Sequence, residues 1–385
     1  MEMLIDALNK INMAFNQRIK AKRSYEVEDE LAFIQDFPEP KDDIERAYFQ
    51  YKCSCFLYEQ KIILFFKNIV SLAGILYYML VKCRKRPAEG CAHRYVFVFN
   101  GDDLDVVPDK YRDQLMKVNI AFYLYLNKDD KKFIRKIWKR YPFSFFFLFK
   151  CIVKLATYRA AIEMYHPQTI LCSCENSYTS SILTMYCEKM GMEHINLMHG
   201  VVPISVSLAF HRFHVSSVWT AGVIETHKIL RSGSERYEIE IPKCMRYDVK
   251  HDMEQMGRYT YYMQDTSEEI LSGLVNVYRE MQKRGISLIL RPHPVFTNMD
   301  DVKRYLPEAE IEDTESVSIQ DSINRAECII ARFSTVLWQA QIMKKRTMID
   351  DISIPEMYEK LKKRRIFMWD EGAEKMSMFL QSHVK

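Results

Sequence analysis

The residues best suited to chemistry lie in a short loop, Arg291-Pro292-His293-Pro294, that follows an apolar run ending at Leu290. Arginine carries a planar, permanently charged guanidinium that suits phosphate oxygens. Two prolines fix the backbone angle φ and stiffen the turn, so His293 would be held at a set angle. We therefore expect this loop to hold a phosphate, and a proline-rich turn with a surface histidine is the structural alternative.

A second candidate, Ser334-Thr335, lies about forty residues further along the chain. It follows a predicted strand over 328–331 and begins a predicted helix over 336–343. Serine and threonine satisfy free N–H groups at a helix start. The same helix end attracts anions through its backbone N–H groups and its dipole. Capping alone would explain either residue, but its place after a strand predicts a second contribution to phosphate binding.

A base is the other requirement of group transfer, and His199-Gly200 follows a predicted strand over 194–198. A histidine titrates near neutrality and can accept a proton from a hydroxyl, while Gly200 would allow a tight turn that projects His199 outward. Glu175, after a predicted strand over 169–174, could act as the base or orient His199. The alternative for His199 is a structural residue in a turn. A rival source of carboxylates is the loop after residues 95–99, with Asn100, Asp102 and Asp103.

The elements that must position these residues follow a simple rhythm. Residues 1–90 predict helices, with a break at Pro38 and Pro40. From residue 94 short apolar runs alternate with helical stretches, and the rhythm restarts near residue 259. Buried strands alternating with helices predict parallel sheets in an α/β fold. We expect an N-terminal helical region over 1–90, one Rossmann-like domain over 91–240 and a second over 241–385.

The predicted strands fix where the candidate residues lie. They cover residues 95–99, 118–126, 169–174, 194–198 and 217–220 in the first half, and 259–263, 287–290, 309–311, 328–331 and 347–349 in the second. Ligands of open α/β sheets bind beyond the carboxyl ends of the strands, where each candidate loop begins. The sequence therefore predicts an interdomain cleft lined by these loops.

Taken together, these motifs resemble the nucleotide-donor half of GT-B glycosyltransferases: a strand into R-P-H-P, the acidic pair Glu312-Asp313, a short helix, a strand, and Ser-Thr opening a helix. The resemblance is to the bacterial surface-polysaccharide branch, with sialyltransferases and polysialyltransferases, capsule Kdo transferases and CDP-glycerol glycerophosphotransferases. It implies that His293-Pro294 contact the donor phosphate, Ser334-Thr335 the phosphate or nucleotide, and Glu312-Asp313 the base or ribose. Arg291 is expected at the same phosphate.

The resemblance also implies an activity. We expect transfer of a sugar, with sialic acid or Kdo from a CMP-linked donor preferred, to a cell-surface glycan or lipid-linked acceptor, without a metal or other cofactor. Transfer of glycerol phosphate or another polyol phosphate from a CDP-linked donor is an alternative, because the H-G turn at His199 resembles that of the CDP-glycerol polymerases. Sialyltransferases use an acidic base, often in an acidic pair followed by glycine. The one such triplet, Asp370-Glu371-Gly372, lies in the donor half. A non-catalytic nucleotide- or glycan-binding protein is the third hypothesis.

Composition excludes other classes. The 385 residues carry a net charge of +4, are 48% hydrophobic and 28% charged, and include ten cysteines without a C-x-x-C pair. These values are globular and favour neither a nucleic-acid binder nor a zinc site. No G-x-G-x-x-G or Walker loop occurs, which argues against an NAD enzyme or a P-loop kinase. No secretory signal opens the chain, so we expect a cytoplasmic protein with free thiols.

Two segments are candidates for membrane contact. Residues 62–81 are nearly all apolar but include Lys67 and Asn68, and the basic cluster 82–86 follows. A helix buried between domains is the first interpretation, and a helix lying against the inner face of the membrane is the second. Residues 131–154 interleave aromatic and basic side chains, which suits a membrane-facing patch or a buried helix beside a solvated one. We expect peripheral contact through 62–86 and 131–154.

Overall fold

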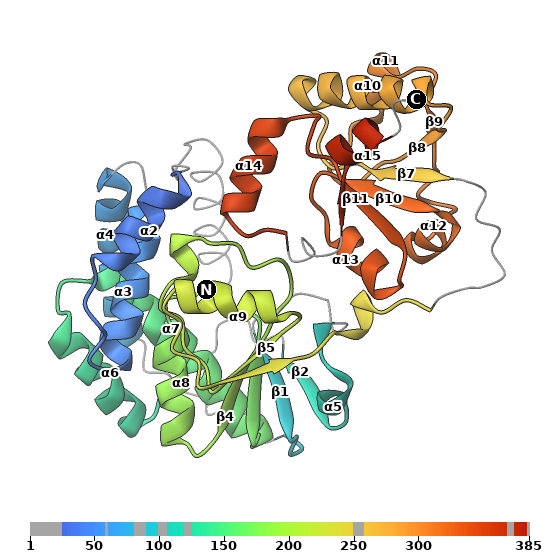
Figure 1. Cartoon of the computed structure of the whole chain (residues 1–385). Coiled ribbons are helices and arrows are strands. Elements are labelled where there is room, and N and C mark those ends of the chain that lie inside the picture. Colours follow the sequence, from blue (N-terminus) through green and yellow to red (C-terminus); the bar gives the residue numbers. More distant parts are fainter. Residues whose placement is uncertain are drawn as a thin grey trace. The chain divides into compact units, whose positions relative to one another are not determined.

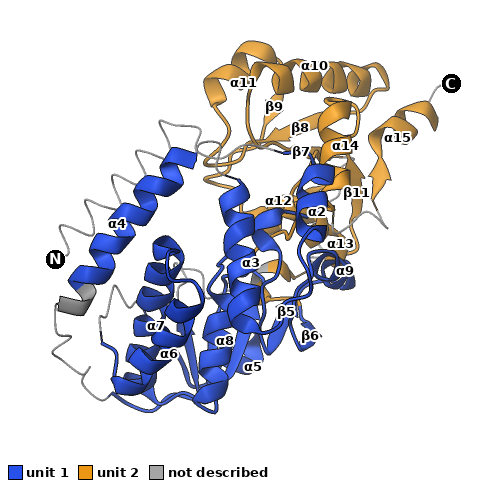
Figure 2. Ribbon diagram, turned by 90° about the vertical axis from the view of Figure 1, so that its left-hand side faces the viewer, with its two compact units in different colours: residues 1–199, 204–240 blue, residues 200–203, 241–385 orange. Residues whose placement is uncertain are grey.

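The computed structural model describes residues 25–57, 61–80, 90–98, 106–118, 125–248, 258–367 and 373–382 (Figure 1). The chain forms two compact units (Figure 2). Unit 1 comprises residues 1–199 and 204–240, and unit 2 comprises residues 200–203 and 241–385. Each unit is built around its own parallel sheet, which confirms the predicted α/β class with two Rossmann-like halves.

Unit 1 holds a six-stranded sheet in the order β2-β1-β3-β4-β5-β6, with every neighbouring pair parallel. Its strands are β1 (Tyr95–Val98), β2 (Leu115–Val118), β3 (Thr169–Cys172), β4 (Glu193–Leu197), β5 (Val215–Val218) and β6 (Arg236–Ile239). Central strands of a parallel sheet are covered on both faces, and all four residues of β3 are accordingly buried. The strand order reverses between β1 and β3, so the loops after these strands border the place where such folds bind ligands.

The helices of unit 1 pack around this sheet. They are α2 (Val27–Gln35), α3 (Asp43–Phe56), α4 (Lys61–Leu80), α5 (Asp109–Arg112), α6 (Lys128–Arg140), α7 (Phe145–Tyr165), α8 (Ser180–Lys189) and α9 (Ala221–Ile229), with a 3-10 turn η2 (Val206–Leu208). A capping box of Asn127 and Asp130 begins α6. The buried Asp130 also pairs with Arg159 of α7, at 2.7 Å between Oδ1 and Nη2, so the cap of one helix is fixed to the next.

Unit 2 holds the second six-stranded parallel sheet, in the order β12-β11-β10-β7-β8-β9. Its strands are β7 (Tyr259–Tyr262), β8 (Leu288–Arg291), β9 (Glu310–Ile311), β10 (Cys328–Ala331), β11 (Arg346–Ile349) and β12 (Glu374–Lys375). Counted from β7, this is the 3-2-1-4-5-6 order of dinucleotide-binding Rossmann folds, and its switch point lies between β7 and β10.

The helices of unit 2 follow the predicted rhythm closely. They are α10 (Glu268–Lys283), α11 (Met299–Tyr305), α12 (Ile319–Arg325), α13 (Thr335–Ile342), α14 (Pro355–Lys363) and α15 (Met376–Ser382), with a 3-10 turn η3 (Lys243–Met245) before the sheet. Gly285 has φ +71° just after α10. Glycine adopts this left-handed conformation without strain, so it suits the end of the helix.

Several elements differ from the sequence prediction, and the short strand β12 is not among the predicted strands. The strand expected over 118–126 is β2 at Leu115–Val118, and residues 119–124 lie outside the described part of the chain. β6 (Arg236–Ile239) is not among the predicted strands. Arg236 and Glu238 interrupt it at the sheet edge, so it has no apolar run. The segment 62–81 is not the buried helix of the first interpretation, since α4 leaves one apolar face exposed. Within the described residues, none of the helices has the length and apolar character needed to cross a bilayer.

Candidate functional site

Glu175 lies at the carboxyl edge of the unit 1 sheet, directly beyond β3. The loop that carries it is tied to β4, because Ser173 Oγ donates to Leu197 O at 2.8 Å and Asn196 Oδ1 accepts from Cys174 N at 3.0 Å. Glu175 is only 4% exposed, and its Oε2 is buried without a hydrogen-bond partner. A buried carboxylate oxygen normally has a donor, so this atom is available to a ligand or a proton.

His199 follows β4 and faces the same carboxylate. Its Nδ1 lies 3.7 Å from Glu175 Oε1, within ion-pair distance but beyond a hydrogen bond. The imidazole is half-exposed, so the histidine of this pair is open to a ligand while the glutamate is enclosed. The fold therefore brings an accessible histidine next to a buried glutamate, although the two residues are 24 positions apart in the chain.

Gly200 has no left-handed backbone angle, and a Cβ added there would meet no atom within 4 Å. The chain bends at Gly200, but the bend needs no left-handed backbone angle, so a small side chain would also fit here. The loop residues Asn100, Asp102 and Asp103, predicted on the acceptor side, lie outside the described residues.

The N-terminal helices fasten the loops that carry the pair. Gln50 of α3 is fully buried, and its Nε2 donates to Glu175 O at 2.8 Å and to Ser207 O at 3.3 Å. Its Oε1 accepts from Ser180 Oγ at 3.2 Å. One side chain thus joins the loop after β3, the start of α8 and the turn η2. This role of Gln50 could not be predicted, because a single glutamine in a helix belongs to no motif.

Arg332 is the strongest anion-binding candidate of unit 2. It follows β10 at the switch point of the sheet and is only 6% exposed. Its Nη2 lies 3.6 Å from Asp265 Oδ1, in the loop after β7, and its Nη1 donates weakly to Met357 Sδ at 3.6 Å. A buried guanidinium with such distant partners has donors to spare for a phosphate. The sequence could have indicated Arg332 by its position between a buried strand and Ser334.

Ser334 and Thr335 occupy the places predicted for them. Ser334 is the N-cap of α13, with its Oγ accepting from Val336 N at 3.3 Å, and Thr335 is the first helical residue. The first turn of α13 holds no acidic side chain. The N-terminus of α13, which carries a partial positive charge, follows Arg332 closely in the chain. The helix dipole and the guanidinium would favour the same anion.

The His293 loop presents one ring nitrogen as a donor. Nδ1 accepts from Val295 N at 3.1 Å and from Phe296 N at 3.4 Å, so the proton of the neutral ring resides on Nε2. Partial burial lowers the pKa of His293, which keeps the ring neutral near pH 7. Thr297 Oγ1 accepts from His293 N and donates to Gln264 O at 2.7 Å, so the loop is fixed to the one after β7. Pro294 is exposed on the same turn.

Arg291 and Glu312 bond to each other rather than to open space. Arg291 Nη1 donates to Glu312 Oε2 at 2.6 Å and Nη2 to Val317 O at 3.0 Å, with both side chains less than a tenth exposed. The pair joins the ends of β8 and β9, and the phosphate and base or ribose contacts expected for these two residues stay predictions. The exposed Asp313 caps a turn through Glu315 N, and hydrogen bonds from Ser316 and Glu315 lower its pKa.

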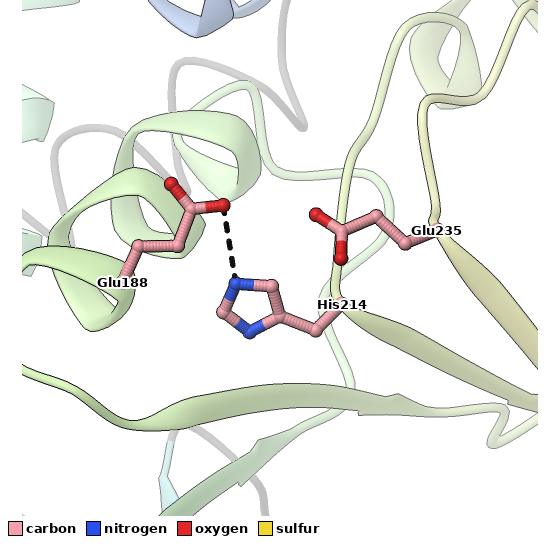
Figure 3. Close-up of side chains that lie close together, drawn as sticks. All are labelled: Glu188, His214 and Glu235. Carbon is pink, nitrogen blue, oxygen red and sulfur yellow. Dashed lines mark hydrogen bonds and ion pairs between the residues drawn. The ribbon is translucent and has the colours of Figure 1, made fainter.

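One group of described residues has the types and spacing of a metal site: Glu188, His214 and Glu235 (Figure 3). It lies at the amino edge of the unit 1 sheet, opposite Glu175, and borders a surface cavity of about 370 Å³. Arg212 Nη2 donates to both carboxylates. His214 Nδ1 accepts from His194 N, which leaves the proton on the Nε2 that faces Glu188. Charge and protons already fill this cluster, so it suits an arginine-centred ion-pair network better than a cation.

Comparison with known proteins adds little beyond the fold. No family model and no curated protein matches the chain. Among solved structures it is similar to the wall teichoic acid polymerase TagF, with 12% identity over 84% of this chain and 88% of that one and a TM-score of 0.37. It is also similar to the kitacinnamycin glycotransferase, with 9% identity, 75% and 86% coverage and a TM-score of 0.41.

A third similar structure is the UDP-GlcNAc 2-epimerase of Methanocaldococcus jannaschii, with 13% identity, 66% and 76% coverage and a TM-score of 0.30. With TM-scores below 0.5, the function has to be argued from the residues of this chain itself.

Proposed function

We propose that this chain is a GT-B-type transferase that moves a group from a nucleotide-activated donor to a hydroxyl of a surface glycan or lipid-linked acceptor. Unit 2 would hold the nucleotide and unit 1 would supply the base. The observation that carries the proposal is Arg332, a buried guanidinium with distant partners at the switch point of a Rossmann-ordered sheet. Phosphates bind at this place in such folds, beside a helix N-terminus.

The donor phosphate would receive three kinds of stabilisation in unit 2. Arg332 supplies a permanent positive charge, α13 supplies free N–H groups behind Ser334 and Thr335, and His293 supplies a neutral Nε2–H donor. Each preorganised donor aimed at developing charge contributes about 3 kcal/mol to transition-state stabilisation in enzymes of known mechanism. Arg291 and Glu312 position the His293 loop in this proposal and do not touch the ligand.

The acceptor hydroxyl would lose its proton to His199. Glu175 orients the imidazole with Nδ1–H toward its carboxylate, which leaves the Nε2 lone pair to accept the proton. The hydroxyl oxygen then bonds to the reacting carbon of the donor as the carbon–oxygen bond to phosphate breaks. The nucleotide leaves with the electron pair, and its new negative charge is neutralised by the groups of unit 2.

The accessible base is a histidine rather than a carboxylate, and this bears on the donor. A CMP-linked sialic acid or Kdo is the donor that the motifs of unit 2 favour. CDP-glycerol or another polyol-phosphate donor is the second candidate, because a histidine in an H-G turn is the base implied by resemblance to the CDP-glycerol polymerases. In that case the hydroxyl oxygen attacks the phosphorus that carries glycerol, the bond from this phosphorus to the bridging oxygen of CMP breaks, and CMP leaves with the electron pair, while His199 still accepts the proton.

The test combines binding and turnover. Calorimetry with CMP, CDP, UDP and GDP should show a preference for cytidine nucleotides, and CMP-sialic acid, CMP-Kdo, CDP-glycerol, UDP-sugars and GDP-sugars are then assayed for hydrolysis and transfer. We expect Arg332→Ala and His293→Ala to weaken nucleotide binding about tenfold or more. His199→Ala should abolish turnover and leave binding unchanged.

The matched control is His93→Ala, which removes a histidine that precedes β1 at the opposite edge of the unit 1 sheet. If none of the nucleotides binds, the transferase proposal fails. If nucleotides bind but His199→Ala behaves like His93→Ala, the chain is a nucleotide-binding protein without this catalytic step.

A further inference from the structure

Helix α4 exposes its apolar side instead of burying it. Seven large apolar side chains are between 42% and 62% exposed, and they fall at helical spacing on one face. We call them the outer face of α4: Ile62, Phe65, Phe66, Ile69, Val70, Leu76 and Tyr77. Half-exposed side chains of this size amount to roughly 600 Å² of apolar surface, at the upper limit for an ordinary monomer.

The opposite side of α4 is packed against α7, and it holds the polar residues. Asn68 Oδ1 accepts from Phe146 N at 3.1 Å at the start of α7, and its Nδ2 donates to Leu64 O. The Lys67 ammonium lies over the Phe146 ring, 5.2 Å from its centroid. A Cβ on Gly74 would lie 2.7 Å from Phe149, so glycine there lets the two helices approach closely. These contacts fix the orientation of α4, which lies beside α7 at the side of unit 1 (Figure 2), and leave the outer face exposed.

The sequence of these segments is rich in cations. Residues 60–88 contain six lysines and arginines and not one carboxylate, and residues 131–162 contain nine and again not one. Carboxylates from outside the second range pair with three of its cations: Asp129 with Lys132, Asp42 and Glu45 with Arg140, and Asp130 with Arg159. The second range covers most of α6 and α7, and α7 is the helix on which α4 packs. On α6 the side chains of Lys131, Arg135 and Lys139 are exposed and lie one turn apart. Phe143, in the turn between α6 and α7, is 83% exposed.

We infer that the outer face of α4 binds the surface of a bilayer that contains anionic lipids, with Phe143 and the cations of α6 contributing at its border. An apolar helix face flanked by lysine and arginine lies in the interfacial plane of a membrane, where side chains enter the acyl boundary and cations meet headgroup phosphates. Pairing with a second copy fits less well, because a twofold interface would bring these cations against each other.

Only part of the second segment expected to contact lipid, residues 131–154, is exposed. Within 131–154, the residues Phe147, Leu148, Cys151 and Ile152 belong to the buried core of unit 1, and Lys150 lies over the Tyr178 ring, 3.9 Å from its centroid. The membrane-facing part of this segment is the exposed side of α6 together with Phe143, since Phe133, Ile134 and Ile137 of α6 also belong to the core. Residues 81–89 of the first segment lie outside the described part of the chain.

Vesicle flotation of the full-length chain, without nucleotide, tests the inference independently of any transferase activity. We expect binding to vesicles of phosphatidylcholine with phosphatidylglycerol, and weaker binding to phosphatidylcholine alone. The double variant Phe65→Ser/Phe66→Ser should lower the partition coefficient about tenfold or more. Met378→Ser is the matched control, because Met378 of α15 is 63% exposed and Phe65 is 62% exposed.

A second variant leaves α4 intact. Lys131→Gln/Arg135→Gln/Lys139→Gln should weaken binding to the anionic vesicles and reduce its dependence on salt, while binding to neutral vesicles stays the same. The inference is overturned if the wild-type chain does not float with either vesicle, or if Phe65→Ser/Phe66→Ser floats as well as Met378→Ser. It is also overturned if light scattering shows a wild-type dimer that this double variant dissociates.

Discussion

The buried ion pair of Arg291 and Glu312 can be used to test how the His293 loop is held in place. Replacing either residue by leucine would leave the other charge buried without its partner. Such single losses cost about 3–5 kcal/mol, whereas replacing both charges by apolar groups costs far less. Arg291→Leu also leaves Val317 O without the donor that lies at 3.0 Å, whereas Glu312→Leu removes one of the two partners of Ser322 Oγ, which keeps the Tyr262 hydroxyl. We expect a coupling energy of about 2 kcal/mol or more in the double-mutant cycle.

Hydrogen-exchange mass spectrometry is the suitable assay, because a chain of two units does not unfold as one two-state system. Peptides covering β8 and β9 should lose protection in Arg291→Leu and in Glu312→Leu and regain most of it in the double variant. Peptides covering β3 and β4, in unit 1, serve as the internal control and should not change.

Nucleotide binding by the double variant decides between two roles for Arg291. If the guanidinium only positions the loop, the double variant should bind nucleotide almost as well as the wild type. A double variant that keeps its protection at β8 but loses nucleotide binding would refute the positioning role. A coupling energy below about 0.5 kcal/mol would show that the ion pair does not fix the loop at all.

Three further predictions concern unit 1 and its edge. Gln50→Leu removes three hydrogen bonds and should cost about 2–4 kcal/mol of local stability, seen as faster exchange near residues 174–180 and 205–208 and as a larger loss of turnover than of nucleotide binding. Burial, as the largest cause, lowers the pKa of three histidines to about 3, 4 and 2 respectively, namely His194, His211 and His227. The unfolded chain would protonate them near pH 6.5 and the folded one would not, so stability present above that pH is lost on acidification by about 1.4 kcal/mol per pH unit per histidine. Because both ring nitrogens of His227 are buried without partners, His227→Leu should remove one third of this slope in urea titrations at several pH values without lowering stability at pH 7. Gly200→Ala should change stability and turnover by less than about 0.5 kcal/mol, because its backbone does not require glycine.

The strands that the sequence predicted well are those of central parallel positions. β10 (Cys328–Ala331) is a continuous apolar run, and β8 (Leu288–Arg291) is one up to its last residue; runs of this kind are typical of buried parallel strands. β6 and β2 lie toward the edges, where Arg236 and Lys117 interrupt the pattern, and they were missed or shifted. Edge strands need fewer apolar side chains, so their sequences carry less of the signal that makes a strand visible.

The site residues divide in the same way. His293 and Ser334 were recognisable because their roles depend on local chemistry, a turn and a helix cap, that the neighbouring residues encode. The ion pair of Arg291 could not be predicted, because Glu312 reaches it only through the pairing of β8 with β9. The orientation of α4 was equally invisible, since an apolar helix with two polar residues has the same sequence whichever side faces the protein.

The N-terminal helices of unit 1 support the loops at the carboxyl edge of its sheet. A Rossmann-like sheet needs no such extension, yet two buried polar side chains of α2 and α3 point into the loops that follow β3 and β4. Glu30 Oε2 accepts from Val206 N at 2.6 Å, and Gln50 donates to the backbone of Glu175. Burying a carboxylate and an amide costs several kcal/mol unless each finds its partners, so the two loops and the two helices hold each other in one arrangement. Loops that would otherwise sample many conformations, at about 1–2 kcal/mol of entropy per residue fixed, are thereby ordered before any acceptor binds. This reasoning predicts that Glu30→Gln, which keeps an acceptor oxygen, should preserve turnover better than Glu30→Leu, as measured by steady-state kinetics. Equal losses in the two variants would mean that bulk alone, and not the hydrogen bond to Val206, secures the loop.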